Sequence, residues 1–520
     1  MIKRNRKNGD ILISVLVFAA IAVTVTVGLA NWGASMLAGI RTVQAKEQAF
    51  QIAEAGIDYY RWHLAQYPTD YKDGTTTPAP YYHNFYDKND NFIGQYSLTI
   101  TPPPVGSTKV VITSTGTTTA APTVKRVVQA ALAQPSLAQY AVVANDQMVF
   151  GSGTTVYGPI TSNRGIHFDG LAHNVISSAL ATDTDPDQDS GSCSPYPKCA
   201  VEWGVWTEVP PADPQPSTAL NNHNGDVFLA GRQNSVSAFP FGSLAVNLNT
   251  LHTLANGGVA GGACTTASGP CWKSSGSGNF GYYIHLNTNG TYDIYKVTAL
   301  QSSPNNCTND ASENQWGTWS YQTLSSKIGT YSIPSNGVIF VEDNLWVDGT
   351  NVGQSTTTSR VTIATAANTS NMSSTTGSNI ILNNDLTYAR YDGSVVVGLI
   401  AQSNVLVGLV SDDNLQVDAA LVAESGHVGR DYYNTHCTSG GTNYWHRTSL
   451  ILNGMIGTDF RYGFQWTGSN NYNCGGSVGQ ISSGYCTRSL NYDPNLLYSP
   501  PPNFPLASTQ YQMAYWKQLQ

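Results

Sequence analysis

A continuous apolar segment from Ile11 to Ala30 opens the hydrophobic pattern of the chain, and no Asp, Glu, Lys or Arg occurs between Asp10 and Arg41. A helix needs about 20 apolar residues to cross a bilayer, so this segment is long enough. Four basic residues precede it: Lys3, Arg4, Arg6 and Lys7. Because basic flanks stay on the cytoplasmic side, the pattern predicts a single-pass membrane helix with a cytoplasmic N-terminus. The bulk of the chain should then lie in the extracellular or periplasmic space.

After this segment the pattern becomes that of an amphipathic helix. Apolar residues recur at spacings of three and four, which places them on one helical face: Phe50, Ala53, Ile57, Tyr60 and Leu64. Pro68 ends the pattern, because proline does not continue a helix. We therefore expect residues 10–67 to form one long helix. Its apolar end would lie in a membrane or a filament core, and its amphipathic end would pack on a globular unit.

Residues 68–134 show the alternation of a small β unit. A polar connector, residues 69–86, comes first. Apolar side chains then recur in three short runs, which predict three strands: Tyr96, Leu98 and Ile100; Val110 and Ile112; Val124, Val127 and Val128. A Pro-rich turn that ends at Gly106 separates the first two runs. The expected unit consists of a few antiparallel strands packed on the lower half of the helix.

The basic leader, Gly9, the apolar segment and the stretch QAFQIAEAGI from Gln48 to Ile57 together resemble type IV pilin-like proteins, most closely the PilX-type minor pilins and the related pseudopilins. The resemblance implies that the leader, residues 1–9, is cut between Gly9 and Asp10. It also implies that the helix assembles with other pilin-like subunits. The chain departs from the family at Asp10, where a hydrophobic residue is usual, and at Ser14, where major pilins carry Glu. A cleaved secretory signal and an uncleaved membrane anchor are the alternative interpretations.

From Tyr140 onward, short aliphatic runs recur at regular intervals on both sides of a break from Thr182 to Ser335. Five of them contain residues spaced by 20, 20, 19 and 21 positions: Val341, Val361, Ile381, Ile400 and Leu421. Asn, Asp and Gly lie between the runs. A fixed period with turn residues at the corners predicts a parallel (right-handed) β-helix, in which these five side chains point inward and stack. A β-sandwich with evenly spaced strands is the alternative.

Changes in composition suggest boundaries within this β region. The parts are 135–181 for the first solenoid coils, 182–335 for a Cys-, Pro- and Gly-rich insertion, 336–490 for the main solenoid, and 491–520 for a Pro-rich strap and tail. Within the insertion, Asn289-Gly290 predicts a hairpin from Tyr282 to Val297. In the tail, residues 511–519 are expected to form a short capping helix.

Composition indicates an ordered, β-rich extracellular protein. The 520 residues include 49 Gly and 25 Pro, only 11% are charged, and the formal net charge is −8. The 29 Tyr and 11 Trp supply ample apolar surface to bury, which argues against disorder. The charge balance gives no sign of a general nucleic-acid partner.

The eight cysteines all follow residue 134 and none belongs to a CxxC motif, which favours disulfides over a zinc ribbon or a redox motif. Two short spacings across turns predict the pairs Cys193–Cys199 and Cys264–Cys271. Cys474 with Cys486 is a third expected pair, which leaves Cys307 with Cys437.

Four aspartates alternate at the start of the insertion: Asp183, Asp185, Asp187 and Asp189. They resemble the beginning of an EF-hand-like calcium loop, because calcium prefers several oxygen ligands from a flexible segment. Pro186, the missing Gly at the sixth position and the missing bidentate Glu depart from that motif. Calcium is the one cofactor that the sequence suggests, and a solvated acidic loop is the alternative.

Catalysis is not expected, although parallel β-helices often host enzymes that cleave polysaccharides. The nearest candidate group combines three carboxylates with two arginines: Asp412, Asp413, Asp418, Arg390 and Arg430. These residues lie at expected corners, where Asp is common in turns, and no base is identified with a partner.

Two further groups have an ambiguous interpretation. Three histidines near Cys437 match no standard metal-binding spacing: His427, His436 and His446. Tryptophans in the irregular segments could form a glycan- or protein-binding surface or the core of those segments: Trp272, Trp316, Trp319, Trp445 and Trp466.

These patterns together predict a structural or adhesive minor pilin-like subunit of a type IV pilus or a related secretion filament. It would be inserted in the cytoplasmic membrane and would display a large β domain at the cell surface. Its expected partners are other pilin-like subunits through the helix, the membrane, and a surface glycan or protein. The alternative is a surface-anchored β-helix protein that binds or acts on glycans and never enters a filament.

Overall fold

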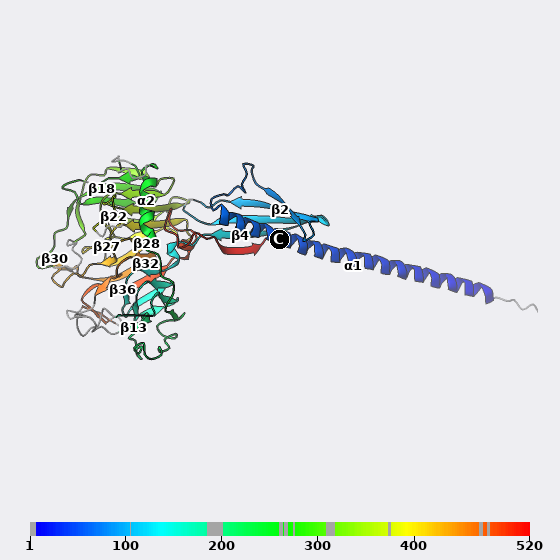
Figure 1. Ribbon diagram of the computed structural model, residues 1–520, viewed down its shortest axis with the longest axis horizontal. Helices are drawn as coiled ribbons and strands as arrows, with labels where there is room; N and C mark the ends of the chain where they lie inside the picture. The colour runs from blue at the N-terminus through cyan, green and yellow to red at the C-terminus, as the bar shows by residue number, and fades with distance from the viewer. Residues whose placement is uncertain are drawn as a thin grey trace, which may run out of the picture. The chain divides into compact units, whose positions relative to one another are not determined.

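The computed structural model describes residues 7–104, 106–184, 201–258, 264, 269–273, 276–307, 318–372, 376–466, 472–475 and 479–519 (Figure 1). The chain forms two compact units. Unit 1 comprises Met1–Pro102, Lys109–Ala133 and Gln510–Gln520, and unit 2 comprises Pro103–Thr108 and Gln134–Thr509. Both ends of the chain therefore belong to unit 1, and most of unit 2 is inserted in the sequence between two of its strands.

Unit 1 is built on a single helix, α1 (Lys7–Gln66), of 60 residues. Its first half extends beyond the sheet of the unit (Figure 1), and its apolar side chains from Ile11 to Val43 are exposed. The second half is amphipathic as predicted: Ala53, Ile57, Tyr60 and Leu64 are buried and Phe50 is half-buried. The expected long helix with two different halves is therefore present in the structure.

The buried face of α1 packs on an antiparallel sheet of five strands. In spatial order these are β1 (Tyr81–Tyr86), β2 (Phe92–Thr101), β3 (Val110–Thr118), β4 (Ala121–Ala133) and β37 (Gln512–Gln518). The three predicted strands correspond to β2, β3 and β4, and the buried residues of β2 alternate through Tyr96, Leu98 and Ile100 as expected. The connector contributes the additional strand β1.

The C-terminal tail is a strand, so the predicted capping helix is wrong. Strand β37 pairs antiparallel with β4, with Trp516 opposite Ala130. Pairing with the edge of β4 satisfies the backbone groups of both segments, and the aromatic Tyr515 and Trp516 favour a strand. Trp516 also contacts Phe50 of α1, with ring centroids 6.0 Å apart.

Unit 2 is a stack of parallel strands arranged in rows. The longest row contains, in spatial order, β16 (Cys271–Trp272), β21 (Val338–Val341), β23 (Ser359–Thr365), β26 (Val395–Ala401), β28 (Asn414–Ala423), β32 (His446–Thr458), β5 (Val142–Ala144), β8 (Ile160–Ser162), β11 (Ile176–Ser178) and β15 (Arg232–Gln233). A second row contains β17 (Gly281–Leu286), β22 (Leu345–Val352), β24 (Ile380–Ile381), β27 (Val405–Val407) and β29 (Val428–Arg430).

Two further rows complete the stack. One continues from β25 (Leu386–Tyr388) through β28 and β32 to β36 (Ser483–Tyr492), β7 (Thr154–Tyr157) and β10 (Leu171–Ala172). The other contains β6 (Met148–Phe150), β9 (Ile166–Phe168) and β14 (Val205–Trp206). The apolar residues between these rows form one core, to which strands from β5 to β36 contribute.

The remaining elements lie outside these rows. They are the helix α2 (Ser243–Ala255), the 3-10 turns Leu137–Gln139 and Pro494–Leu497, and short antiparallel strands: β18 (Thr291–Leu300), β19 (Tyr321–Leu324), β20 (Gly329–Ser332), β12 (Thr182–Thr184), β13 (Val201–Trp203), β30 (Thr438–Ser439), β31 (Thr442–Asn443), β33 (Gln465–Trp466), β34 (Tyr472–Gly475) and β35 (Gly479–Ile481). Strands β17 and β18 form the hairpin expected from Asn289-Gly290. Helix α2 covers one side of the stack with Leu248 and Leu251, which pack in a cluster with Phe340.

The spatial order of the strands differs from their order in the sequence. Strand β32 is the last strand of the longest row in sequence order, and β5 is the first. The two pair with each other, and Ile456 lies opposite Val142. In the same way β36 pairs with β7, with Leu490 opposite Val156. In sequence order, the first strand of the stack, β5, therefore lies in the middle of the row. The following strands extend the row to one end at β15. The chain then continues with β16 at the opposite end, and the remaining strands fill the row back to β32, next to β5.

The predicted stacking register is wrong in detail, although all five residues of the 20-residue pattern are buried. Val361 lies opposite Val397, and Ile400 lies opposite Val422. The pattern fails because the loops at the corners differ in length: partners in the row are separated by 24 residues at Val338–Thr362 and by 36 at Val361–Val397. Ile381 packs outside the main core, in a cluster with Trp346 and Leu406.

The predicted insertion, 182–335, is partly integrated in the stack. Strands β14, β15, β16 and β17 all lie in its rows. The Pro, Gly and Trp content of this stretch hides strands that are only two to six residues long. The composition of this stretch therefore does not indicate where the stack begins and ends.

Asparagine side chains form a ladder at one corner of the stack. The Asn344 side-chain oxygen accepts a hydrogen bond from the Asn379 backbone N–H at 2.9 Å, and that of Asn379 accepts from the Asn404 N–H at 3.0 Å. The Asn404 oxygen accepts from the His427 N–H at 2.8 Å. Each asparagine thereby satisfies a backbone donor just before the next strand of the second row, which gives Asn its place at this corner.

Candidate functional site

The exposed half of α1 is the first candidate site, because it presents a long apolar surface. The helix Ile11–Gln66 is long and apolar enough to cross a membrane by length and composition. Two threonine hydroxyls on it are satisfied within the helix: that of Thr24 donates to the Ala20 carbonyl and that of Thr26 to the Ala22 carbonyl, both at 2.8 Å. This surface can therefore enter an apolar environment without leaving those hydroxyl groups unpaired.

The other end of α1 is fixed to unit 1 by polar contacts. The Tyr60 hydroxyl donates to the Asp70 carbonyl at 2.8 Å, and His63 Nε2 lies 2.9 Å from Asp70 Oδ2. Burial, together with Asp73, raises the pKa of Tyr59 to about 12, and Tyr59 donates to Asp73 Oδ1 at 3.1 Å. The exposed half of α1 therefore continues from a second half that is held by hydrogen bonds to the rest of unit 1.

The predicted processing site lies within α1. Helix α1 begins at Lys7, so the peptide bond between Gly9 and Asp10 belongs to its helical backbone. Cleavage of this bond remains a prediction.

The predicted calcium ligands are only partly within the described residues. Asp183 accepts from Arg164 Nε at 3.0 Å and from the Gly165 N–H at 2.8 Å. Burial alone would raise the pKa of Asp183, but these hydrogen bonds lower it overall. Asp185, Asp187 and Asp189 lie outside the described residues, so the calcium site remains a prediction in which Asp183 already has protein partners.

Three disulfides are present among the described residues, and they join pairs named in the sequence analysis. Cys264 is bonded to Cys271, Cys307 to Cys437, and Cys474 to Cys486. Cys193 and Cys199 lie outside the described residues. The Cys307–Cys437 bond spans 130 residues and links two segments that are remote in the sequence.

The candidate catalytic residues do not assemble into one site. Asp413 accepts from the Thr448 hydroxyl at 2.6 Å, and Asp418 accepts from the Tyr388 N–H at 2.8 Å. Arg390 and the fully buried Arg430 donate to backbone carbonyls, those of Thr356 and Tyr444 among them. These hydrogen bonds to backbone and hydroxyl groups give the four side chains a structural role.

Two of the three histidines near Cys437 have separate partners in the structure. His446 stacks on Tyr472 with ring centroids 3.8 Å apart, and His427 Nε2 lies 3.9 Å from Asp431. Trp272, Trp319 and Trp445 are buried, Trp466 is half-buried, and Trp316 lies outside the described residues. Three of these five tryptophans are therefore buried, which weakens the interpretation that they form a glycan-binding surface.

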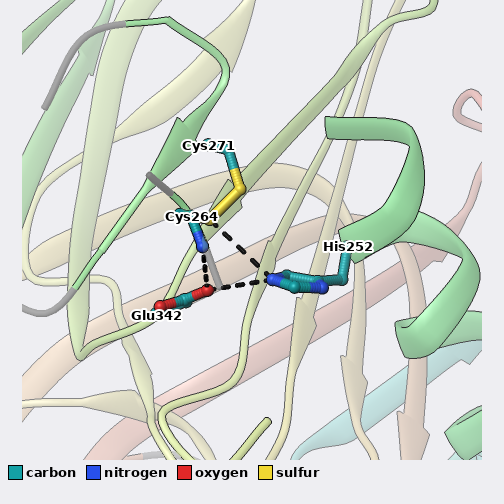
Figure 2. A group of neighbouring side chains, drawn as sticks. All are labelled: His252, Cys264, Cys271 and Glu342. Carbon is teal, nitrogen blue, oxygen red and sulfur yellow. Dashed lines mark hydrogen bonds and ion pairs between the residues drawn. A yellow bond between two sulfur atoms is a disulfide. The ribbon is translucent and has the colours of Figure 1, made fainter. Parts of the chain in front are cut away.

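Two groups of potential metal ligands occur among the described residues, and sequence reasoning missed both. Figure 2 shows the first, in which His252 from α2 and Glu342 lie beside the Cys264–Cys271 disulfide. His252 Nε2 is 2.9 Å from Glu342 Oε1, and the same oxygen accepts from the Cys264 N–H at 2.6 Å. The two sulfur atoms are bonded to each other. In this disulfide-bonded state the group has a structural role, in which Glu342 links His252 of α2 to Cys264.

The second group consists of His167, Asp169 and Glu208. The only signal for it in the sequence is a histidine followed two residues later by an aspartate, the first on β9 and the second just after its end. Glu208 is distant in the sequence, so the pattern alone could not join it to them.

Comparisons with known proteins give little additional information. No family model matches the chain, and no curated protein matches it. Among solved structures, the chain is similar to the competence-associated pilin ComZ from Thermus thermophilus, with 14% identity and a TM-score of 0.30, over 91% of this chain and 97% of that one. A TM-score this low carries no weight, so the function proposed below rests on the contacts within the chain.

Proposed function

We propose that this protein is a minor pilin-like structural subunit that anchors through α1 and displays unit 2 outside the membrane. The observation that carries the proposal is the division of α1. Its apolar side chains from Ile11 to Val43 are exposed, whereas Ile52, Tyr60 and Leu64 are buried on the sheet. A helix of this kind can exchange bilayer contacts for packing against neighbouring helices in a filament.

In this proposal unit 2 is a parallel β-helix. Its parallel rows, its common core and its asparagine ladder support this assignment. Its role is structural or adhesive, with a surface glycan or protein as the ligand, and catalysis is not part of it. The bonded state of Asp413, Asp418, Arg390 and Arg430 supports that choice.

The leader, residues 1–9, is proposed to be removed after Gly9. Its removal would take away the basic residues that hold the N-terminus at the cytoplasmic face. Mass spectrometry of the N-terminal peptide from native cells tests this step. A mature chain that starts at Asp10 is expected, and Gly9→Val should prevent its formation. An unprocessed chain would instead indicate a membrane-anchored β-helix protein, which is the alternative function.

Filament membership requires its own measurement. Purified filaments should contain the tagged protein, and a variant with Leu16→Asp and Phe18→Asp in the exposed apolar half should be absent from them. The matched control places Asp at Trp62, which is exposed on the docked half of the helix. Filaments that contain neither the wild type nor the control would overturn the pilin-like proposal.

A further inference from the structure

One histidine and two carboxylates converge at the row formed by β6, β9 and β14. A ring nitrogen of His167 and one carboxylate oxygen each from Asp169 and Glu208 all lie within 4.8 Å of one another. His167 Nε2 and Asp169 Oδ2 are 3.1 Å apart. With metal–ligand bonds of about 2.1 Å, the ligand atoms of a tetrahedral site are separated by about 3 to 3.5 Å. Small side-chain movements therefore suffice to place all three atoms around one ion.

Strand β9 determines the direction of the first two ligands. His167 lies between Ile166 and Phe168, which are both fully buried in the core. Because side chains alternate along a strand, His167 points away from that core, and Asp169 follows two residues later on the same side. Trp206 lies directly opposite His167 on β14 and stacks on its ring, with centroids 5.3 Å apart.

Two hydrogen-bond donors orient Asp169, the Thr207 hydroxyl and the Glu208 backbone N–H, and neither donor is one of the potential metal-binding atoms. Its Oδ1 accepts from the Thr207 hydroxyl at 2.9 Å and from the Glu208 N–H at 2.8 Å. Its Oδ2 consequently faces His167. Such outer hydrogen bonds orient the ligands of metal sites in proteins.

A second His–Asp pair in unit 2 shows what distinguishes this group. His223 Nδ1 lies 3.1 Å from Asp226 Oδ2, and its Nε2 lies 3.0 Å from the Pro211 carbonyl oxygen. Within the part of the chain that the structure describes, no third carboxylate, histidine or cysteine joins that pair in a potential metal group. The exposed Glu208, by contrast, gives His167 and Asp169 a third ligand that is open to solvent.

We propose that His167, Asp169 and Glu208 bind a divalent transition-metal ion of the Zn²⁺ type. One imidazole nitrogen with two carboxylate oxygens suits such an ion, whereas Ca²⁺ prefers oxygen ligands alone. Three protein ligands leave at least one position for water or an external ligand. The ion would join β9 to the segment after β14, which the sequence separates by about 40 residues. This site is independent of the proposed pilin-like role and would be present whether or not the chain enters a filament.

The test uses the full chain in detergent micelles, stripped of metal with a chelator and with its disulfides intact. Calorimetric titration with ZnCl₂ should show one equivalent of tight binding, and zinc should raise the melting temperature. Glu208→Gln, at an exposed position, should weaken zinc binding at least about tenfold, and Asp169→Asn or His167→Asn should abolish it. The control Asp226→Asn changes the His223–Asp226 pair described above and should bind zinc like the wild type.

Three results would overturn the proposal. These are the absence of tight zinc binding by the wild type, zinc affinity that is unchanged in both Glu208→Gln and His167→Asn, or a preference of the same three residues for Ca²⁺. A melting temperature of Glu208→Gln that equals that of the metal-free wild type would show that the variant is folded, so that its loss of affinity reports on the ligand.

Discussion

Gly116 of strand β3 lies directly against Ala49 of helix α1. A Cβ atom on Gly116 would come within 2.1 Å of the Ala49 carbonyl oxygen and 2.6 Å of the Ala53 backbone nitrogen. The backbones of the helix and the sheet therefore touch at a point where any side chain on the strand would separate them. This contact sets how closely the docked half of α1 approaches the sheet.

Gly116→Ala should accordingly weaken the docking of α1. Backbone atoms cannot move aside as a flexible side chain can, so we expect a loss of about 1–3 kcal/mol in the stability of unit 1. Differential scanning calorimetry should show a lower melting temperature for unit 1. Thr115→Ala, on the neighbouring half-buried position of the same strand, is the control and should change it little. Equal melting of Gly116→Ala and the wild type would mean that α1 does not pack this closely.

Ile381 tests the layer of unit 2 that lies outside the main core. It is 0% exposed and packs in a cluster with Trp346 and Leu406. Ile381→Asp would bury a charge without a partner and should cost several kcal/mol, about 3 or more. Chemical denaturation measures this loss. Ile451→Asp is the matched control, because Ile451 on β32 is 37% exposed. The control should be nearly neutral, and a similar loss of stability in both variants would refute the assignment.

His285 should make the stability of unit 2 depend on pH. Its Nδ1 lies 2.6 Å from Asp348 Oδ1, and this hydrogen bond raises the pKa of His285 above 6.5. Because the folded pKa is raised, the stabilisation is complete below pH 6.5 and is lost as the pH rises through the folded pKa. The difference in melting temperature between the wild type and His285→Gln should therefore be larger near pH 6 than near pH 8.5. A difference that grows with pH would contradict this assignment.

The long-range disulfide should stabilise unit 2 more than a short one. The Cys307–Cys437 bond closes a loop of 130 residues and the Cys474–Cys486 bond a loop of 12. Chain-entropy arguments give about 5 kcal/mol for the first and about 3 kcal/mol for the second. Replacing each pair by Ser and measuring thermal unfolding compares them directly, and peptide mapping without reduction checks all pairings, Cys193–Cys199 included. A larger effect of the short pair would show that loop entropy is not the dominant contribution.

Calcium binding by the acidic segment remains a proposal with a direct test. Calcium should raise the melting temperature of the full chain, and a double Asp185→Asn, Asp187→Asn variant should not respond. Asp183→Asn serves as a contrast, because Asp183 is bonded to Arg164 and its loss should lower stability with or without calcium. Identical melting curves of the wild type with calcium and with chelator would refute the calcium site.

Local patterns in the sequence determined the elements whose partners are close in the chain. The apolar run from Ile11 and the later three-and-four spacing specify α1 and its two halves, because a helix forms from neighbouring residues. Alternation specifies β2, and Asn289-Gly290 specifies the β17–β18 hairpin, since both depend on local geometry. The spacing of the cysteines likewise suggested Cys264–Cys271 as a bonded pair.

Only the tertiary structure decided which distant segments meet. Val142 lies opposite Ile456 and Trp516 opposite Ala130, although the sequence separates both pairs by hundreds of residues. When the loops between parallel strands vary in length, paired residues are not separated by a fixed number of positions in the sequence. The regular spacing of aliphatic runs could therefore indicate that Ile381 is buried, but not which residues pack against it. The approach of Glu208 to His167 follows from the parallel pairing of β14 with β9, and no local pattern encodes it.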